Sequence, residues 1–255
     1  MYFDTHIHLN SEKYNDNFDE MFEEMLTSGV KYFVCPGEDI ESSRKAIELA
    51  EKHKEIYVVV GIHPEAVNNY SDEDLKELEE LAKHSKVVGI GEIGLDYYWV
   101  KDNKEAQKEL LIKQIAIANK LDLPIILHIR EATVDILDIL KEHDKNKKGI
   151  FHCVPLNEHL IKEGLKLGYY ISFSGNITFQ NARPNESIKL VGLDKILVET
   201  DGPYLAPHPH RGKINSSKYL KYIVKKIAEV KEIDVEELKE ILVKNSKEVY
   251  EVNEK

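Results

Sequence analysis

Long apolar runs, cysteine and basic charge are what this sequence has least of. No uninterrupted apolar stretch approaches the roughly 20 residues that cross a bilayer. No basic start leads into an apolar segment with a small-residue cleavage site. The two cysteines, Cys35 and Cys153, end different predicted strands and do not make a disulfide framework. We therefore expect a cytoplasmic protein that does not bind a membrane.

Basic residues are outnumbered by acidic ones. The 35 lysines and arginines face 46 aspartates and glutamates, so the net charge is −11. A protein that coats nucleic acid by charge alone needs a broad basic surface, which this composition excludes, leaving only a local site. Glutamine is also rare: it occurs only at positions 107, 114 and 180, a composition that leans toward thermophilic proteins.

Short β-branched runs alternate with longer amphipathic segments, about thirty residues apart. The 255 residues suit one (β/α)8 barrel, so we expect a single domain over 1–255. Strands are predicted at 2–8, 31–35, 56–61, 87–92, 125–128, 149–153, 169–173 and 196–199. Helices are predicted at 15–28, 39–53, 71–84, 103–122, 131–144, 157–167, 185–192 and 216–231.

A further amphipathic segment, 235–245, follows Asp234 as its N-cap and is expected to pack outside the barrel. The fold class is therefore α/β, a TIM barrel with an extra C-terminal helix. The alternation also permits a doubly wound open sheet, in which ligand groups cluster near one switch point. Polar residues that follow six of the predicted strands, as a ring of βα loops requires, favour the barrel.

Histidines and acids at the ends of predicted strands are the candidate metal ligands. If 2–8 is a strand, Asp4, His6 and His8 share one face, and Phe3, Thr5 and Ile7 share the other. Later strands lead into four more candidates, namely Glu92, His128, His152 and Asp201. Such a set would meet in one bowl at the C-terminal end of a barrel.

Four imidazoles and two carboxylates form a mixed nitrogen and oxygen set suited to divalent cations such as Zn, Mn, Fe or Mg. One ion uses three or four ligands, whereas six with a central carboxylate would hold two ions about 3.5 to 4 Å apart. Glu92 comes from the strand between the first pair of histidines and the later pair, so we assign it as the bridging ligand.

Six segments carry a resemblance that runs through nearly the whole chain. The segments are Asp4-Thr5-His6-Ile7-His8-Leu9, Gly61-Ile62-His63-Pro64, Gly91-Glu92-Ile93-Gly94-Leu95-Asp96-Tyr97-Tyr98, Leu127-His128-Ile129-Arg130-Glu131-Ala132, Tyr170-Ile171-Ser172-Phe173-Ser174-Gly175 and Glu199-Thr200-Asp201-Gly202-Pro203-Tyr204-Leu205-Ala206-Pro207. With these segments the chain resembles the TatD family of metal-dependent deoxyribonucleases, within the amidohydrolase-like barrels.

The resemblance implies one ion held by His6, His8, Glu92 and Asp201, and another held by Glu92, His128 and His152. It also implies hydrolysis of DNA phosphodiesters with two divalent ions (Mg, Mn or Zn), often as a 3′ to 5′ exonuclease acting on DNA ends or single strands. The chain departs from the family pattern after Cys153 (Val154-Pro155-Leu156-Asn157) and at Ser216-Ser217, where the family usually has a proline. These departures bear on loop shape and substrate preference.

Asp201 is the candidate general base, because it follows the last strand and could accept the proton of a metal-activated water. Glu199 lies two residues earlier and would either orient a histidine ligand or cap the barrel interior through hydrogen bonds. His63 has no place in either ligand set and is a candidate phosphate donor. Arg130 would meet a phosphate or pair with Glu131.

Two stretches near the predicted mouth are candidate substrate contacts. The segment 203–215 concentrates positive charge in an acidic chain, with His208, His210, Arg211 and Lys213, and is where we expect substrate phosphates. Four aromatic residues would either stack on a terminal base or simply pack: Tyr97, Tyr98, Trp99 and Tyr204.

Two other functions are consistent with these residues. One is metal-dependent hydrolysis of a different ester or amide, as in a D-aminoacyl-tRNA deacylase or a small-molecule amidohydrolase. Many amidohydrolase-like barrels bridge their ions with a modified lysine. The candidate bridging ligand here is Glu92, which argues against those branches of the superfamily. The other is a metal-stabilised binding protein without turnover, against which the candidate base Asp201 argues.

Overall fold

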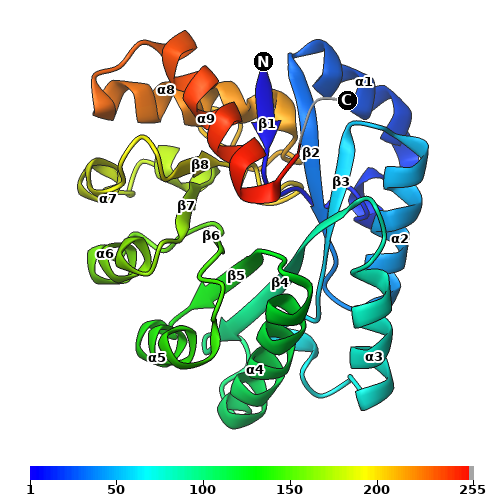
Figure 1. The fold of residues 1–255 in the computed structure, drawn as a ribbon. Coiled ribbons are helices and arrows are strands. Elements are labelled where there is room, and N and C mark those ends of the chain that lie inside the picture. The colour runs from blue at the N-terminus through cyan, green and yellow to red at the C-terminus, as the bar shows by residue number, and fades with distance from the viewer. Residues whose placement is uncertain (253–255) are drawn as a thin grey trace.

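Eight parallel strands form a nearly closed barrel in residues 1–252, the part of the chain that the computed structural model describes. The strands neighbour one another in chain order, which confirms the predicted fold class (Figure 1). Their bounds are Tyr2–Asp4 (β1), Val30–Pro36 (β2), Ile56–Val60 (β3), Val87–Asp96 (β4), Ile125–Arg130 (β5), Gly149–Phe151 (β6), Tyr170–Phe173 (β7) and Ile196–Val198 (β8).

Helices follow the strands and surround them (Figure 1). The α-helices are Phe18–Thr27 (α1), Ile40–Lys52 (α2), Asp72–Leu81 (α3), Lys104–Leu121 (α4), Thr133–His143 (α5), Glu158–Lys166 (α6), Asn185–Leu190 (α7), Leu220–Lys231 (α8) and Val235–Tyr250 (α9). Short 3-10 helices are Glu12–Asn17 (η1), Pro64–Ala66 (η2), Gly175–Thr178 (η3) and Ser217–Tyr219 (η4). None of the helices in residues 1–252 has the length and apolar content needed to cross a bilayer.

Most strands contribute to two separate apolar layers. In β2, Phe33 and Cys35 belong to the large cluster between strands and helices, whereas Val34 belongs to a smaller cluster. The smaller cluster contains one side chain from most strands and fills the barrel interior. Both faces of the sheet are therefore buried, and this explains why its strands appear as nearly continuous apolar runs.

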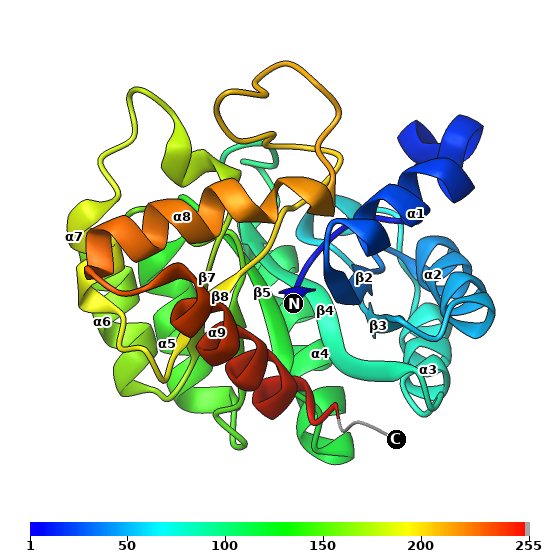
Figure 2. The same cartoon turned by 90° about the horizontal axis from the view of Figure 1, so that it is seen from above.

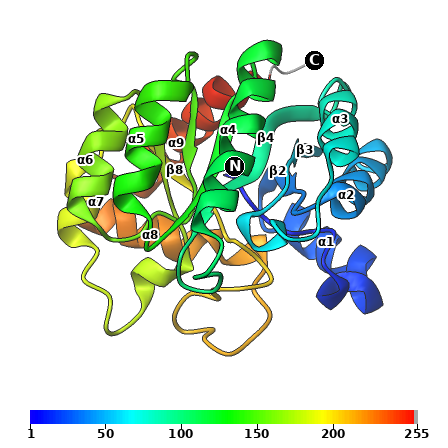
Figure 3. The ribbon, with the colours of Figure 1, turned by 90° about the horizontal axis from the view of Figure 1, so that it is seen from below.

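The C-terminal helix α9 closes the N-terminal end of the barrel. Its Val243, Val249 and Tyr250 belong to the interior cluster. The Asn245 amide donates to the carbonyl of Ile196, the first residue of β8, at 2.9 Å. Figures 2 and 3 show α9 and the long loop after β8 at opposite ends of the molecule. The helix was expected to pack outside the barrel, and the structure places it over one end of the barrel, which an apolar helical face can cover as well as a side.

The seam between β1 and β8 is closed by loop segments. The prediction of a strand over 2–8 was wrong: β1 ends at Asp4. Beyond it, Asp201 N donates to the carbonyl of His6 at 2.9 Å, and His8 N donates to the carbonyl of Gly202 at 2.8 Å. Ile7 and Gly202 form an isolated parallel bridge. Three of the candidate ligands thus lie on the two segments that complete the barrel.

Strand β4 extends to Asp96, four residues past the predicted end, so Glu92 lies within the strand rather than after it. Gly94 makes this possible, because its φ is +147° and a Cβ atom there would lie 1.9 Å from the carbonyl oxygen of His128. Only glycine fits this position. The close approach holds β4 and β5 together beside the candidate site.

Gly94→Ala should lower the free energy of unfolding by roughly 3 kcal/mol or more, since it combines a disfavoured φ with a backbone clash. Urea denaturation of both variants measures the effect against Gly212→Ala as a control. Gly212 also has a positive φ (+84°) but no atom within 4 Å of its added Cβ. The control should lose only about 1 kcal/mol. Equal losses would contradict the close-approach explanation.

Candidate metal centre

The carboxylate of Glu92 lies between two pairs of histidines. Its Oε2 atom is 3.2 Å from His6 Nε2 and 3.8 Å from His8 Nε2. Its Oε1 atom is 2.9 Å from His128 Nδ1 and 3.0 Å from His152 Nε2. Each carboxylate oxygen therefore faces its own pair of ring nitrogens. This is the arrangement that a bridging carboxylate requires.

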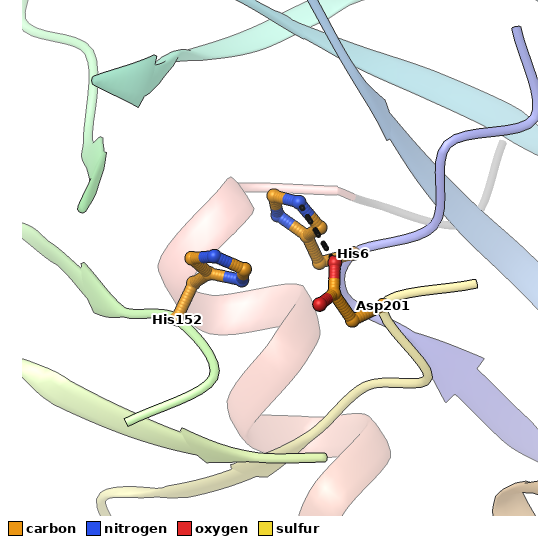
Figure 4. A group of neighbouring side chains, drawn as sticks. All are labelled: His6, His152 and Asp201. Atoms are coloured by element: carbon orange, nitrogen blue, oxygen red, sulfur yellow. Dashed lines mark ion pairs between the residues drawn. The ribbon is translucent and has the colours of Figure 1, made fainter. Parts of the chain in front are cut away.

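Asp201 completes the group on the His6 and His8 side. Its Oδ1 atom is 3.3 Å from His8 Nε2 and 3.9 Å from His6 Nε2. Figure 4 shows its carboxylate directed at the His6 ring, with His152 alongside. The Asp201 backbone is in the left-handed region (φ +55°), which aspartate tolerates better than most residues. Its side chain is 15 % exposed, so this side of the site is open to solvent.

The donor set fits divalent cations. The Nε2 atoms of His6 and His8 lie only 3.3 Å apart and point to the same place as two carboxylates. The rings of His6 and His152 stack with centroids 4.0 Å apart, and both rings are buried. Three groups have donor atoms close enough together to surround one ion: His6 with His152 and Asp201, His6 with His8 and Glu92, and His63 with Glu92 and His128.

Two carboxylates select the ring nitrogens that face the centre. Asp96 Oδ2 lies 2.9 Å from His128 Nε2, and Glu199 Oε1 lies 2.9 Å from His152 Nδ1. A carboxylate accepts, so each of these nitrogens carries a hydrogen, which leaves the opposite nitrogen as the one that could ligate an ion after losing its own proton. Glu199 thus orients a histidine, one of the two roles considered for it. Sequence analysis gave Asp96 no role.

His63 lies at the centre but is oriented as a donor. Its Nε2 atom is 3.4 Å from Glu92 Oε1. Its Nδ1 atom accepts from the backbone N–H of Glu65 at 3.2 Å. A neutral imidazole that accepts at Nδ1 carries its hydrogen at Nε2, where it can donate to an oxygen. This tautomer is unsuited to metal ligation through Nε2.

The charges of the cluster are coupled. Burial opposes ionisation of Glu92, but His152 and His63 hold its pKa well below its ordinary value. Burial likewise disfavours protonated His128, yet Asp96 and Glu92 raise its pKa to about 9. For Asp201, burial is the largest single effect, but the hydrogen bond from His8 and the charges of the nearby histidines together lower the pKa. Protonated His128 therefore balances part of the carboxylate charge. The same negative field would favour a divalent cation, whose binding would release that proton.

Asp4 supports the seam rather than facing the histidines. Its buried carboxylate accepts from Thr200 N at 2.9 Å, Thr200 Oγ1 at 2.5 Å and Ser217 Oγ at 2.6 Å. Phe3, not Asp4, enters the barrel interior. The expectation that Asp4 shares a face with His6 and His8 was wrong, because regular strand periodicity ends at Asp4. Ser217, one of the departures from the family pattern, is one of the donors to Asp4.

Two of the three glutamines hold backbone beside the site. Gln114 on α4 accepts from Ile62 N at 2.7 Å and donates to Ile62 O at 2.9 Å, next to His63. Gln107, two turns earlier on α4, pairs in the same way with the backbone of Asp96, at 2.9 and 3.0 Å. Both glutamines are buried. Their seven-residue spacing is the signal in the sequence that could have indicated this role, and neither glutamine was predicted to belong to the site.

The candidate substrate contacts are spread around the mouth. Arg130 continues the inward face of β5 two residues after His128, and its guanidinium lies over the rings of Tyr98 and Trp99. Within residues 1–252 it forms no ion pair with Glu131. Tyr97 does not border the mouth as predicted, because it is buried and donates to Asp135 Oδ2 at 2.6 Å.

The remaining candidates lie on the loop after β8. Tyr204 is 46 % exposed, and its ring lies 5.8 Å from that of His8. Arg211 lies over the ring of Phe179, 3.6 Å from its centroid, and Lys213 is exposed. No hydrogen bond or ion pair in residues 1–252 joins the side chains of Arg211 or Lys213 to the six ligand candidates. Both belong to an outer part of the mouth.

Comparison with known proteins gives this geometry a family. Residues 3–251 match the family model described as TatD-related DNase. The chain belongs to the TatD family. It is 42 % identical to YabD of Bacillus subtilis (strain 168), an uncharacterized metal-dependent hydrolase, over 99 % of this chain and 100 % of YabD. It is 35 % identical to YcfH of Escherichia coli (strain K12), likewise uncharacterized, over 92 % of this chain and 90 % of YcfH.

Solved TatD structures share the barrel. YjjV, a TatD homologue from Escherichia coli K12, aligns with a TM-score of 0.94 and 27 % identity, over 99 % of this chain and 98 % of YjjV. An organophosphorus hydrolase from Deinococcus radiodurans aligns with a TM-score of 0.67 at 13 % identity, over 98 % of this chain and 92 % of the hydrolase, a likeness of fold alone. The chain is therefore a metal-dependent hydrolase of the TatD family.

Glu92→Gln should lower occupancy at both metal positions, because the amide nitrogen that replaces one carboxylate oxygen cannot bridge. Elemental analysis after reconstitution and desalting measures the result. We expect the wild type to retain about two equivalents and the variant fewer than about one. Two full equivalents in the variant would refute the bridging role.

Asp96→Asn should weaken one of two metal-binding steps about 10- to 100-fold, since an amide no longer enforces the His128 tautomer. Competition with a chromophoric chelator separates the two steps. Asp135→Asn is the matched control, because Asp135 accepts from neighbouring Tyr97 but contacts no ligand candidate. Unchanged affinity in Asp96→Asn would exclude its orienting role.

Proposed function

We propose that this protein hydrolyses phosphodiester bonds in DNA, from a 3′ end, with Asp201 as the general base. The observation that supports this most is the placement of Glu92, with one oxygen toward each histidine pair. A two-sided centre of this kind suits displacement at phosphorus, where both the attacking and the leaving oxygen need stabilisation. The description of the matching family as TatD-related DNase agrees with this assignment.

Two divalent cations (Mg, Mn or Zn), when bound, would supply Lewis acidity toward phosphate oxygens and lower the pKa of the attacking water. The proton of the attacking water is taken up by a group of the protein itself. Asp201 accepts this proton at a carboxylate oxygen, since its side chain lies at the open side of the site beside His6 and His8. His63, with its hydrogen at Nε2, donates to a non-bridging phosphate oxygen.

Preference for chain ends follows from shape. The centre lies at the end of a barrel, and four of its members, His6, His8, Glu92 and His152, are at most 5 % exposed. A scissile phosphate must therefore enter a concave site, which a flexible single-stranded end does more readily than the middle of a duplex. Lys213 and Arg211 on the outer loop would meet phosphates further along the strand.

Asp201→Asn should retain metal and lose hydrolysis of end-labelled single-stranded DNA by about 10³-fold or more. Metal content is measured on the same sample, so that loss of turnover is separated from loss of ions. Activity equal to that of the wild type would remove Asp201 from the mechanism.

The same assay is run with two alternative substrates, an aminoacyl-tRNA and a small carboxylic ester. The wild-type protein is loaded with each metal in turn, and the rate of hydrolysis of each substrate is measured. The proposal requires faster hydrolysis of the DNA than of either ester. Cleavage of the aminoacyl ester with no release of nucleotides from DNA would instead assign the centre to ester hydrolysis.

A further inference from the structure

The exposed aromatic side chains gather at one end of the barrel. Among the large apolar side chains exposed in residues 1–252, three are aromatic: Tyr98, Trp99 and Tyr204. All three follow the C-terminal ends of strands, Tyr98 and Trp99 after β4 and Tyr204 after β8. Trp99 is the only tryptophan of the chain, and 62 % of its surface is exposed. Exposed rings that gather at one end of the barrel, beside the candidate centre, suggest a binding surface more than scattered exposed side chains would.

Trp99 belongs to a built unit with Tyr98 and Arg130. The rings of Tyr98 and Trp99 meet edge to face, with centroids 4.7 Å apart. The guanidinium of Arg130 lies 4.4 Å from the Tyr98 centroid and 5.5 Å from the Trp99 centroid. We call these three residues the aromatic platform. It combines a flat π surface with a fixed positive charge.

Asp96 links the aromatic platform to His128, one of the ligand candidates. The Oδ1 atom of Asp96 accepts from the backbone N–H groups of Tyr98 and Trp99, at 2.9 and 2.7 Å. The other oxygen of the same carboxylate bonds His128 Nε2. Arg130 lies only two residues after His128 on β5, about 7 Å along the strand. The platform is thus held rigidly beside the centre rather than on a loose loop.

We propose that the aromatic platform is a nucleobase subsite, which binds the unpaired base next to the scissile phosphate. A base offers a π face to Trp99, and its phosphate offers negative charge to Arg130. Stacking tolerates every base, so this subsite selects single-stranded polynucleotide without reading its sequence. The identity of the ligand as a nucleotide rests on the proposed function.

The test uses the sole tryptophan as its reporter. Metal-loaded protein is titrated with a single-stranded phosphorothioate oligonucleotide, which resists hydrolysis, and Trp99 emission is followed. The control is Tyr57→Leu, because Tyr57 is likewise an aromatic ring beneath a cationic side chain, here Lys86, but lies near the start of β3, at the other end of the barrel. We expect saturable quenching in wild type and control.

Kinetics of Trp99→Leu then locate the effect. KM for single-stranded DNA should rise about 5- to 100-fold with little change in kcat, whereas hydrolysis of an abasic oligonucleotide of the same length, which has no bases to stack on the ring, should stay within about threefold. Trp99→Tyr, which keeps an aromatic face, should recover most of the lost affinity.

Several outcomes would overturn the inference. They are an emission spectrum unchanged at saturating oligonucleotide, a wild-type KM in Trp99→Leu, or equal losses on both substrates, which would indicate a structural role. If the wild-type protein hydrolyses neither substrate, the proposed function fails. The emission titration still decides whether the platform binds a base.

Discussion

The rest of the site depends on the buried carboxylate of Glu92, whose two oxygens both need a positively charged or hydrogen-donating partner. One oxygen faces His6 and His8, and the other faces His128 and His152. A buried charge is tolerated only if it is paired or coordinates a metal. The surrounding polar contacts serve this arrangement: Asp96 and Glu199 fix two rings, and Gln107 and Gln114 hold the backbone beside Asp96 and His63.

The seam that closes the barrel between β1 and β8 also carries three of the ligand candidates, His6, His8 and Asp201. In a regular strand His6 and His8 would share one face about 7 Å apart along the chain, whereas here their Nε2 atoms lie 3.3 Å apart and Asp201 Oδ1 lies 3.3 Å from His8 Nε2. Short strands joined through loop hydrogen bonds allow that convergence. The buried Asp4 carboxylate, with its bonds to Thr200 and Ser217, holds the irregular segment in place. At the opposite end, α9 seals the interior, and Tyr250 donates to the Thr5 carbonyl immediately before His6.

The barrel, most strand positions and the six ligand candidates could be predicted from sequence, because βα alternation and donors after apolar runs are local patterns. The residues at which the strands end could not be predicted in this way. Asp4 and His6 are two residues apart but face different surroundings, since the strand stops between them. The position of α9 was also beyond a local pattern, as an amphipathic helix fits either a barrel end or its flank. Asp96 and the two glutamines act through contacts with residues distant in sequence, which spacing alone does not reveal.

The aromatic platform links substrate recognition to the same framework. Asp96 is shared by the turn of Tyr98 and Trp99 and by His128, so one carboxylate positions both a proposed base contact and a proposed ligand. Rigid placement of this kind limits how far a bound strand can shift relative to the reacting phosphate.

The most direct test of the central claim is anomalous diffraction from crystals of the protein soaked in Mn²⁺. We predict two manganese peaks about 3.5 to 4 Å apart, one beside each oxygen of Glu92, between His6 and His8 on one side and His128 and His152 on the other. A single peak, or peaks that leave Glu92 uncoordinated, would contradict the two-sided centre.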